Sequence, residues 1–373
     1  MRIAITGAHG FVGWHTRCAL KAHSIHDVIE IDRDLMSDPM RLSAAIRNVD
    51  AILHLAGVNR ADPDVLRDEN LSIARRLTSS LDHSQTLPVV VFGNSIQSGN
   101  GTPFGDGKQA AAEHLFKWGE ASGAPIVNLV LPNLFGEHGR PNYNSVVATF
   151  CHDLVQGREP TNHQDREVPL LHVQDAVEWM TSLIGTDHSM TLSPSGRLTT
   201  VTSLLELLYE FRDFYSSGEI PSLVDPFHLS LFNTFRSFCF PTRFPIQPPP
   251  RTDPRGTLFE CLRSHGGESQ VFCSTTNPGF TRGDHFHLRK VERFLVLRGT
   301  AEISLRRLFD DTVHRFKVTG QTPAMVDMPT MWAHSITNTG NEELVTMFWA
   351  HELFDPEMSD TFPERVELAG IDQ

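Results

Sequence analysis

Cysteine is scarce in this chain of 373 residues, which holds five cysteines and no C-x-x-C pair. An odd number of thiols without paired spacing argues against a disulfide framework, so we expect buried thiols in a reducing compartment. The five positions are Cys18, Cys151, Cys239, Cys261 and Cys273.

Basic side chains and long apolar runs are lacking as well. The chain has 32 lysines and arginines against 45 acidic residues, a net charge of −13, which argues against a nucleic-acid-binding surface. No run approaches the roughly 18 apolar residues of a membrane helix, and a strand pattern that begins at residue 2 leaves no room for a signal peptide. We therefore expect a cytoplasmic enzyme without nucleic-acid or membrane partners.

The length of the chain exceeds that of one ordinary core and predicts two domains. A proline-dense stretch over residues 241–254 cannot form a regular element and marks the boundary. Before it, alternating strand and helix patterns predict a doubly wound parallel sheet, and after it short β-rich runs predict a small all-β barrel. We place the domains at residues 1–245 and 246–373.

The first strand runs directly into a glycine-rich turn, TGAHGFVG, that opens a helix. Glycine is needed where the backbone turns tightly and approaches a pyrophosphate at a helix N-terminus. The next strand ends at Asp32, which could hold a ribose hydroxyl of NAD, whereas Arg33 could accept the 2′-phosphate of NADP. The choice between NAD and NADP stays open.

These elements, with the segment DAILHLAGVNR at residues 50–60, resemble the extended short-chain dehydrogenase/reductase family. The resemblance implies an α/β Rossmann-type domain that binds NAD or NADP. The cofactor-binding residues that it implies are Gly7, Gly10, Phe11, Val12, Gly13, Asp32, Arg33, Leu55, Ala56, Gly57 and Lys108.

A second set of residues has the spacing of metal ligands. Alternate residues of a strand face the same side, so His285 and His287 should point into one cavity, and the turn that follows can bring Glu292 beside them. His334 lies in PTMWAHSITN. Imidazoles and a carboxylate suit a divalent transition metal, zinc being a natural occupant. The spacing from Gly279 to Gly299 resembles the first motif of a cupin, a jelly-roll barrel, and the His334 segment resembles the second, with Met331 where a glycine is usual.

Almost end to end, the chain is similar to the CapF family of capsular polysaccharide synthesis enzymes. The resemblance implies a two-step enzyme acting on a UDP-linked 4-keto-6-deoxy-N-acetylhexosamine, with inversion of C3 in the cupin domain and reduction of C4 by NADPH in the nucleotide domain. The matching segments are residues 94–97 (NSIQ), 132–136 (PNLFG), 141–151 (PNYNSVVATFC), 255–260 (RGTLFE), 281–287 (TRGDHFH) and 354–362 (FDPEMSDTF).

The resemblance also suggests roles for single residues. Asn133, Tyr143 and Asn144 would contact the substrate, and Arg255 and Arg282 are candidates to hold its diphosphate, because guanidinium groups bind phosphate oxygens bidentately. The segment around Arg282 further resembles dTDP-4-dehydrorhamnose 3,5-epimerase. In that comparison His285 is a general base, and the other three metal-site residues remain as ligands.

The reductase half departs from its family at the proton donor. Residues 102–108, TPFGDGK, match the start of a catalytic helix with Thr102 as its cap and Pro103 in its first turn. Phe104 occupies the tyrosine position, while Ser95 and Lys108 persist. Loss of a positioned general acid costs roughly 10²- to 10⁴-fold in rate.

Several functions therefore stay open. The chain could be a two-step enzyme with a modified proton route, or a one-step cupin enzyme with a catalytically silent nucleotide domain. It could also act on a related ketone, or bind a nucleotide or sugar without catalysis. The convergent histidines and carboxylate favour an enzyme. Because cupin barrels often pair through strands, we expect a homodimer.

Overall fold

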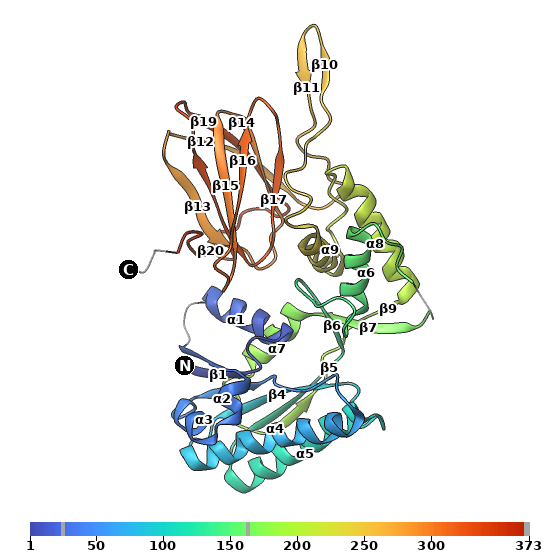
Figure 1. The fold of residues 1–373 in the computed structure, drawn as a ribbon, viewed down its shortest axis with the longest axis vertical. Coiled ribbons are helices and arrows are strands. Elements are labelled where there is room, and N and C mark those ends of the chain that lie inside the picture. Colours follow the sequence, from blue (N-terminus) through green and yellow to red (C-terminus); the bar gives the residue numbers. More distant parts are fainter. Residues whose placement is uncertain (24–26, 162–164, 369–373) are drawn as a thin grey trace. The chain divides into compact units, whose positions relative to one another are not determined.

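The computed structural model describes residues 1–23, 27–161 and 165–368, which form two compact units. The first unit holds Met1–Phe135 and Glu167–Thr199, and the second holds Gly136–Arg166 and the chain from Thr200 onward. Both units are drawn in Figure 1.

A six-stranded parallel sheet forms the centre of the first unit, with strand order β2-β1-β3-β4-β5-β8. Its strands are β1 (Arg2–Thr6), β2 (Asp27–Ile31), β3 (Ala51–His54), β4 (Val89–Ser95), β5 (Ile126–Leu131) and β8 (Met190–Leu192). A second, three-stranded sheet joins β6 (Asn133–Phe135), β7 (Glu167–His172) and β9 (Arg197–Thr200).

Alternate residues of the parallel strands enter two separate cores, one on each face of the sheet. Ala4 of β1 packs with the helices of one face, whereas Ile3 and Ile5 pack with those of the other. Side chains of the first core come from α2 (Arg33–Ser37), α3 (Pro39–Ala45), α4 (Pro63–Ser84) and α5 (Pro103–Ser122), and those of the second from α1 (Phe11–His23) and α7 (Val173–Ser182). The doubly wound fold expected from the sequence is confirmed (Figure 1).

Two antiparallel sheets form the β-rich part of the second unit, with orders β12-β19-β14-β17 and β16-β15-β18-β13-β20. Apolar residues of both sheets, among them Phe294, Ile303 and Phe348, share one core, as in a jelly roll. The strands are β12 (Gln270–Thr276), β13 (Thr281–Phe286), β14 (Glu292–Arg298), β15 (Thr300–Arg307), β16 (Val313–Thr319), β17 (Met325–Met328), β18 (Trp332–Asn338), β19 (Leu344–Ala350) and β20 (Phe362–Pro363). The small hairpin β10 (Arg251–Asp253) and β11 (Gly256–Leu258) stands apart from them.

Three helices belong to the same unit as these sheets: α6 (Val146–Val155), α8 (Val201–Ser216) and α9 (Pro226–Cys239). Arg293 and Asp327 form a fully buried ion pair, with Nε 2.6 Å from Oδ1. Tyr215 of α8 donates its hydroxyl to Oδ2 of Asp327 at 2.8 Å. Arg236 of α9 donates to the carbonyl of Met328 at 3.2 Å. The domain boundary predicted between residues 245 and 246 stays a prediction. The two compact units divide the chain differently, because α6, α8 and α9 group with the β-sheets.

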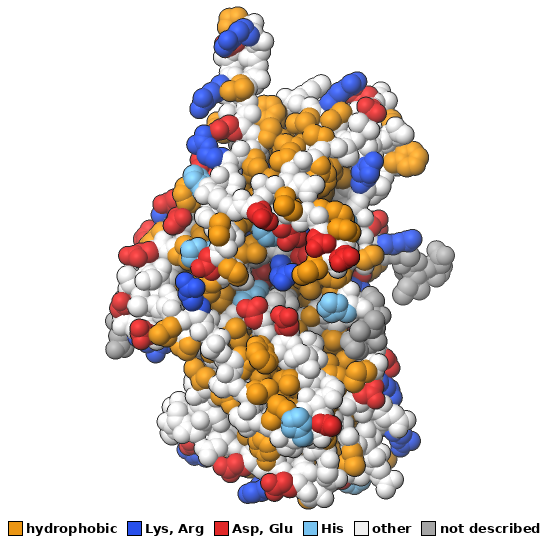
Figure 2. All heavy atoms as spheres, turned by 180° about the vertical axis from the view of Figure 1, so that it is seen from behind, with side chains coloured by type: hydrophobic (Ala, Val, Ile, Leu, Met, Phe, Trp, Pro, Cys, Tyr) orange, Lys and Arg blue, Asp and Glu red, His pale blue; other side chains and the backbone are white. Residues whose placement is uncertain are grey.

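The surface carries no single dominant charge on the face shown in Figure 2, where lysine and arginine side chains are scattered among acidic ones. Within residues 1–23, 27–161 and 165–368, no helix is both long enough and apolar enough to cross a membrane.

Candidate functional site

The glycine turn joins the end of β1 to the start of α1, and two of its glycines are required by close backbone contacts. Gly7 has φ +70°, and a Cβ there would lie 2.9 Å from the amide nitrogen of Ala56. A Cβ on Gly13 would lie 2.2 Å from the carbonyl oxygen of Gly7. The turn is closed by a hydrogen bond from the Gly10 amide to that same carbonyl, at 2.9 Å. Strand, turn and helix thus pack too tightly for any side chain at these positions.

A cavity of about 870 Å³ opens beside this turn. The predicted cofactor-binding residues that line it are Gly7, Gly10, Asp32, Arg33, Leu55, Ala56 and Gly57. Phe11, Val12, Gly13 and Lys108 are not among the described residues that line it. Ser37, Glu69 and Arg76 line it too, and sequence reasoning missed them because they lie on α2 and α4, outside any motif.

Asp32 is engaged within its own loop. Its Oδ1 accepts the amide N–H of Leu35 at 2.7 Å and caps α2. The neighbouring Arg33 is exposed and lines the same cavity. Both side chains thus lie beside the cavity, but one carboxylate oxygen of Asp32 already accepts a hydrogen bond as the N-cap of α2.

The helix α5 begins as its sequence predicts. Thr102 caps it by accepting the amide of Gly105 at 3.1 Å, and Pro103 occupies the first turn. Lys108, one turn after the half-buried Phe104, donates from Nζ to the carbonyl of Gly93 at 2.7 Å and lies 4.3 Å from the Phe92 ring centroid. Burial lowers the pKa of Lys108 to about 8.

Other predicted residues of the reductase half lie in separate settings. Ser95 ends β4, and its hydroxyl accepts the amide of Gln97 at 3.2 Å. Asn133 in β6 donates to the carbonyl of Pro169 at 3.3 Å. In the second unit, Tyr143 lies beneath the guanidinium of Arg140, 5.1 Å from its ring centroid, and Asn144 is exposed just before α6.

The four predicted metal ligands converge in the second unit. His285, His287, Glu292 and His334 each offer a ligand atom, and these atoms all lie within 4.8 Å of one another. Three strands supply them, because β13 ends just before His287, β14 begins at Glu292 and β18 carries His334. Oε2 of Glu292 is 3.2 Å from Nε2 of His287 and 3.3 Å from Nε2 of His334.

A β-bulge in β13 directs His285 toward the cluster. Gly283 pairs with Ser335 and His285 with His334, so Asp284 is an extra residue between them. Asp284 has φ +56°, and a Cβ on Gly283 would lie 2.6 Å from the carbonyl oxygen of His334. The bulge lets Arg282 and His285, which would alternate in a regular strand, line one cavity.

Backbone carbonyls orient two of the imidazoles. Nδ1 of His334 lies 3.1 Å from the carbonyl oxygen of Trp332, and Nδ1 of His287 contacts the carbonyl oxygen of Asp360. A carbonyl only accepts, so both Nδ1 atoms carry the proton and both Nε2 atoms present lone pairs. The amide of Met331, at φ +62°, also donates to the carbonyl of His287 at 2.7 Å.

The electrostatics of the cluster fit a cation. Burial first, and the nearby His334 and His287 second, lower the pKa of His285 to about 3. Burial opposes ionisation of Glu292, but the contacts with His287 and His334 outweigh burial and lower the pKa of this carboxyl. Imidazole nitrogens and a carboxylate therefore converge within the cluster, an arrangement that a divalent cation satisfies.

A cavity of about 480 Å³ contains this cluster, and Arg282 lines it. Nε and Nη2 of Arg282 donate to Thr276 Oγ1 and to the carbonyl of Thr275, at 3.0 and 2.9 Å. Arg255 does not line it among the described residues, because it lies at the turn of the exposed β10–β11 hairpin and pairs with Asp253 at 2.6 Å. Lys290, which also lines the cavity, was missed from the sequence, where no spacing rule marks it.

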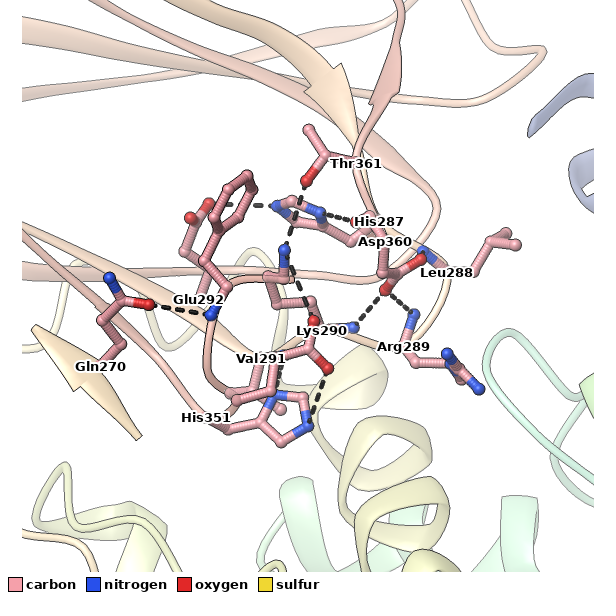
Figure 3. A network of polar contacts seen from close by, with 12 residues as sticks. Gln270, His287, Leu288, Arg289, Lys290, Val291, Glu292, His351, Asp360 and Thr361 are labelled. Atoms are coloured by element: carbon pink, nitrogen blue, oxygen red, sulfur yellow. Dashed lines mark hydrogen bonds and ion pairs between the residues drawn. The ribbon is translucent and has the colours of Figure 1, made fainter. Parts of the chain in front are cut away.

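Asp360 fixes the turn that joins the histidines to Glu292. Its carboxylate accepts the amides of Leu288, Arg289 and Lys290 at 2.9, 2.7 and 2.7 Å, as Figure 3 shows. Because the Asp360 carbonyl also contacts His287, this one residue holds both the ring and the turn. Nothing in the sequence motif pointed to it, since it lies about seventy residues downstream.

Comparisons with known proteins cover both halves of the chain. The model of the NAD dependent epimerase/dehydratase family matches residues 3–191, and that of the polysaccharide biosynthesis C-terminal domain matches residues 251–362. A UDP-2-acetamido-2,6-beta-L-arabino-hexul-4-ose reductase from Pseudomonas aeruginosa is 34% identical over 369 residues, covering 97% of this chain and 98% of that protein.

Solved structures agree with these matches. The capsular polysaccharide assembling protein CapF from Staphylococcus aureus is 31% identical with a TM-score of 0.61, covering 98% of this chain and 100% of its own. A UDP-N-acetylglucosamine 4-epimerase from Bacillus cereus is 18% identical with a TM-score of 0.51, covering 57% of this chain and 82% of its own. At that identity it shares the fold alone.

Proposed function

We infer the function from one premise: this chain belongs to the CapF family, and through its first half to the NAD dependent epimerase/dehydratase family. It is therefore a nucleotide-sugar-modifying enzyme of the reductase and epimerase type that acts on a UDP-linked keto sugar. The family of its first half uses a nicotinamide cofactor.

Beyond that, we propose that the β-rich half epimerises C3 of a UDP-4-keto-6-deoxy-N-acetylhexosamine. The proton at C3 is removable because the neighbouring ketone can take up the electron pair as an enolate. His285, His287, Glu292 and His334 would hold a divalent ion, zinc first, which supplies Lewis-acid stabilisation of charge on oxygen. The observation that carries the proposal is the convergence of four ligand atoms inside a cavity large enough for a small molecule.

His285 has a second possible role within the same site. It is the most exposed of the four residues, and burial lowers its pKa, so the ring carries no added proton and one nitrogen keeps a lone pair. As a general base it would leave His287, Glu292 and His334 as ligands, with a coordination position open to substrate. The two roles differ in how many residues the metal needs, so His285→Ala separates them by its effect on metal content.

For the nucleotide-binding half we propose reduction of the C4 ketone by a reduced nicotinamide. Hydride addition at C4 leaves an alkoxide that must receive a proton, and Phe104 has none to give. Ser95 and Lys108 remain, and we assign Lys108 to the nicotinamide ribose. The substitution at Phe104 favours a second candidate function, in which this half binds the cofactor without turnover and only the C3 step occurs.

Proton NMR in D₂O with the UDP-keto sugar and NADPH tests both functions. Loss of the C3 proton signal that a chelator prevents, with NADPH unchanged, supports the one-step enzyme. Loss of the signal together with NADPH oxidation supports the two-step enzyme. If neither changes, this substrate class is wrong, and a related ketone or a binding role replaces it.

A further inference from the structure

Lys290 places a cationic side chain inside the cavity that holds the four-residue cluster. Only 7% of its surface is exposed, and it lines the cavity together with His287 and Glu292. We propose that Lys290 binds the ketone oxygen of the substrate and stabilises the negative charge that forms on it when C3 loses its proton. This inference rests on the C3 epimerisation proposed above.

Contacts from two segments of the chain hold the ammonium in position. Nζ lies 3.2 Å from Oγ1 of Thr361, a contact that Figure 3 shows, and 3.5 Å from Oε1 of Glu352. The Lys290 amide donates to Asp360 at 2.7 Å, which fixes the backbone as well. An ammonium has three N–H donors, and the two described side-chain partners leave one for an oxygen in the cavity.

A structural ion pair alone explains this arrangement less well. The Glu352 side chain is one-third exposed and its oxygen is 3.5 Å from Nζ, so the pair is long and partly solvated. Placing a lysine among Phe294, Phe348 and Ile336, which line the same cavity, costs desolvation that such a pair offsets weakly. A negatively charged oxygen that forms in the cavity during the reaction would offset the desolvation cost of burying this cation.

The other candidate groups in the cavity also favour Lys290 as the partner of the ketone oxygen. Lys290 is not one of the four cluster residues, so it can meet a ketone oxygen without displacing any donor to a divalent ion. Arg282 lines the cavity too, but its Nε and Nη2 are already donated to Thr276 and Thr275. Lys290 is the remaining described cation that lines this cavity.

The step is an isomerisation that needs no oxidant or reductant. The C3–H bond breaks as its proton passes to His285 acting as the base, the electron pair of that bond forms a C3=C4 double bond, and the π pair of the C4 carbonyl moves onto oxygen beside Lys290. Reversal with delivery of a proton to the opposite face of C3 completes the inversion. Lys290 keeps its proton throughout and acts by charge.

The test compares Lys290→Met, Lys290→Arg and the exposed control Lys317→Met in the full-length, metal-loaded protein. The measurements are deuterium incorporation at C3, bound metal by elemental analysis, and KM for the keto sugar. We expect Lys290→Met to lower kcat for exchange by about 10²- to 10³-fold with metal content unchanged. Lys290→Arg should keep the exchange rate within about tenfold of wild type, because arginine restores the positive charge. Lys317→Met should keep the full wild-type rate, because Lys317 is exposed.

Three results would overturn the proposal. A rate of deuterium exchange at C3 in Lys290→Met within about threefold of wild type would show that another group stabilises the negative charge on the ketone oxygen. Loss of metal or of folded structure in both Lys290→Met and Lys290→Arg would make Lys290 a structural residue. In that case Glu352→Gln, which removes the ion-pair partner but leaves the ammonium in place, should lose metal as well. An absence of exchange in the wild-type protein would refute the C3 epimerisation itself, a failure distinct from the other two.

Discussion

His287 and His334 turn the same nitrogen toward the same carboxylate oxygen: Nε2 of each lies within 3.3 Å of Oε2 of Glu292. Both rings do so because their Nδ1 atoms meet backbone carbonyls. The main chain therefore sets the tautomer of both rings, and these carbonyls are not among the four proposed metal ligands.

Replacing Asp360 should weaken metal binding without removing a ligand. In Asp360→Ala the amides of Leu288, Arg289 and Lys290 lose their acceptor, and the turn that holds His287 against Glu292 loosens. We expect zinc affinity to fall by about 10- to 100-fold, measured by competition with a chelator. Asp355→Ala is the matched control, because that carboxylate is exposed and accepts the amide of Glu357, two residues further along the chain. Equal affinities of the two variants would contradict this role of Asp360.

Restoring the missing hydroxyl should restore or accelerate reduction. Phe104 precedes Lys108 by one helical turn, so a tyrosine at this position would sit in the family's relation to the lysine. We expect Phe104→Tyr to raise NADPH oxidation with the keto sugar by about 10²- to 10⁴-fold, followed by absorbance of the reduced nicotinamide. Adding Ser95→Ala should remove much of that gain. An unchanged rate would mean that another group donates the proton.

A single methyl group should disrupt the glycine turn. The Cβ of Gly13→Ala would approach the Gly7 carbonyl to 2.2 Å, and backbone cannot yield as a side chain can. We expect a loss of about 2–4 kcal/mol in the free energy of unfolding, measured in urea, and loss of NADPH binding. Gly185→Ala is the control, because a Cβ there meets nothing within 4 Å. Similar stabilities for both variants would argue against the tight packing of strand and helix.

Acid should destabilise the first unit through His54. Burial first, and the charge of Lys108 second, lower the pKa of His54 from 6.5 to about 3. Below pH 6.5 the unfolded chain binds a proton at His54, whereas the folded chain does not until the pH approaches 3. The contribution of His54 to the free energy of unfolding is therefore complete above pH 6.5 and is lost as the pH falls toward 3. His54 alone should reduce the free energy of unfolding by about 1.4 kcal/mol per unit between about pH 6 and 4.

His54→Gln removes that titration and should flatten the pH dependence by the same amount, measured by urea unfolding at each pH. His188→Gln, at a side chain that is 69% exposed, should leave the slope as it is in wild type. A variant at His54 with the wild-type slope would assign the acid sensitivity to other buried groups.

The sequence predicted those parts of the molecule that depend on local spacing. The turn from Gly7 to Gly13 and the cap at Thr102 were predictable because each satisfies backbone groups within a few residues. The convergence of His285, His287 and Glu292 was predictable because two strands and a short turn place them together. Their roles as ligands stay predictions.

Contacts between distant segments were not predictable in this way. Asp360 and Thr361 reach Lys290 from about seventy residues away, and no local pattern encodes that approach. Arg255 was grouped with the diphosphate on chemical type alone, whereas its nearest acid, Asp253, holds it on an exposed hairpin. The bulge at Asp284 likewise depends on the partner strand β18, which the sequence does not align by itself.

The bulge also ties the site to the segment that follows β19. The carbonyl of Asp284 accepts the amide of Glu364 at 2.9 Å, and its carboxylate accepts the amide of Val366 at 3.0 Å. Thr361 of this stretch lines the cavity that holds the four-residue cluster, and Asp360 holds the turn beside it. A nascent chain that has completed both histidine motifs therefore still lacks these contacts until residues 360–366 have left the ribosome. We therefore expect metal loading of the proposed site to follow synthesis of this segment.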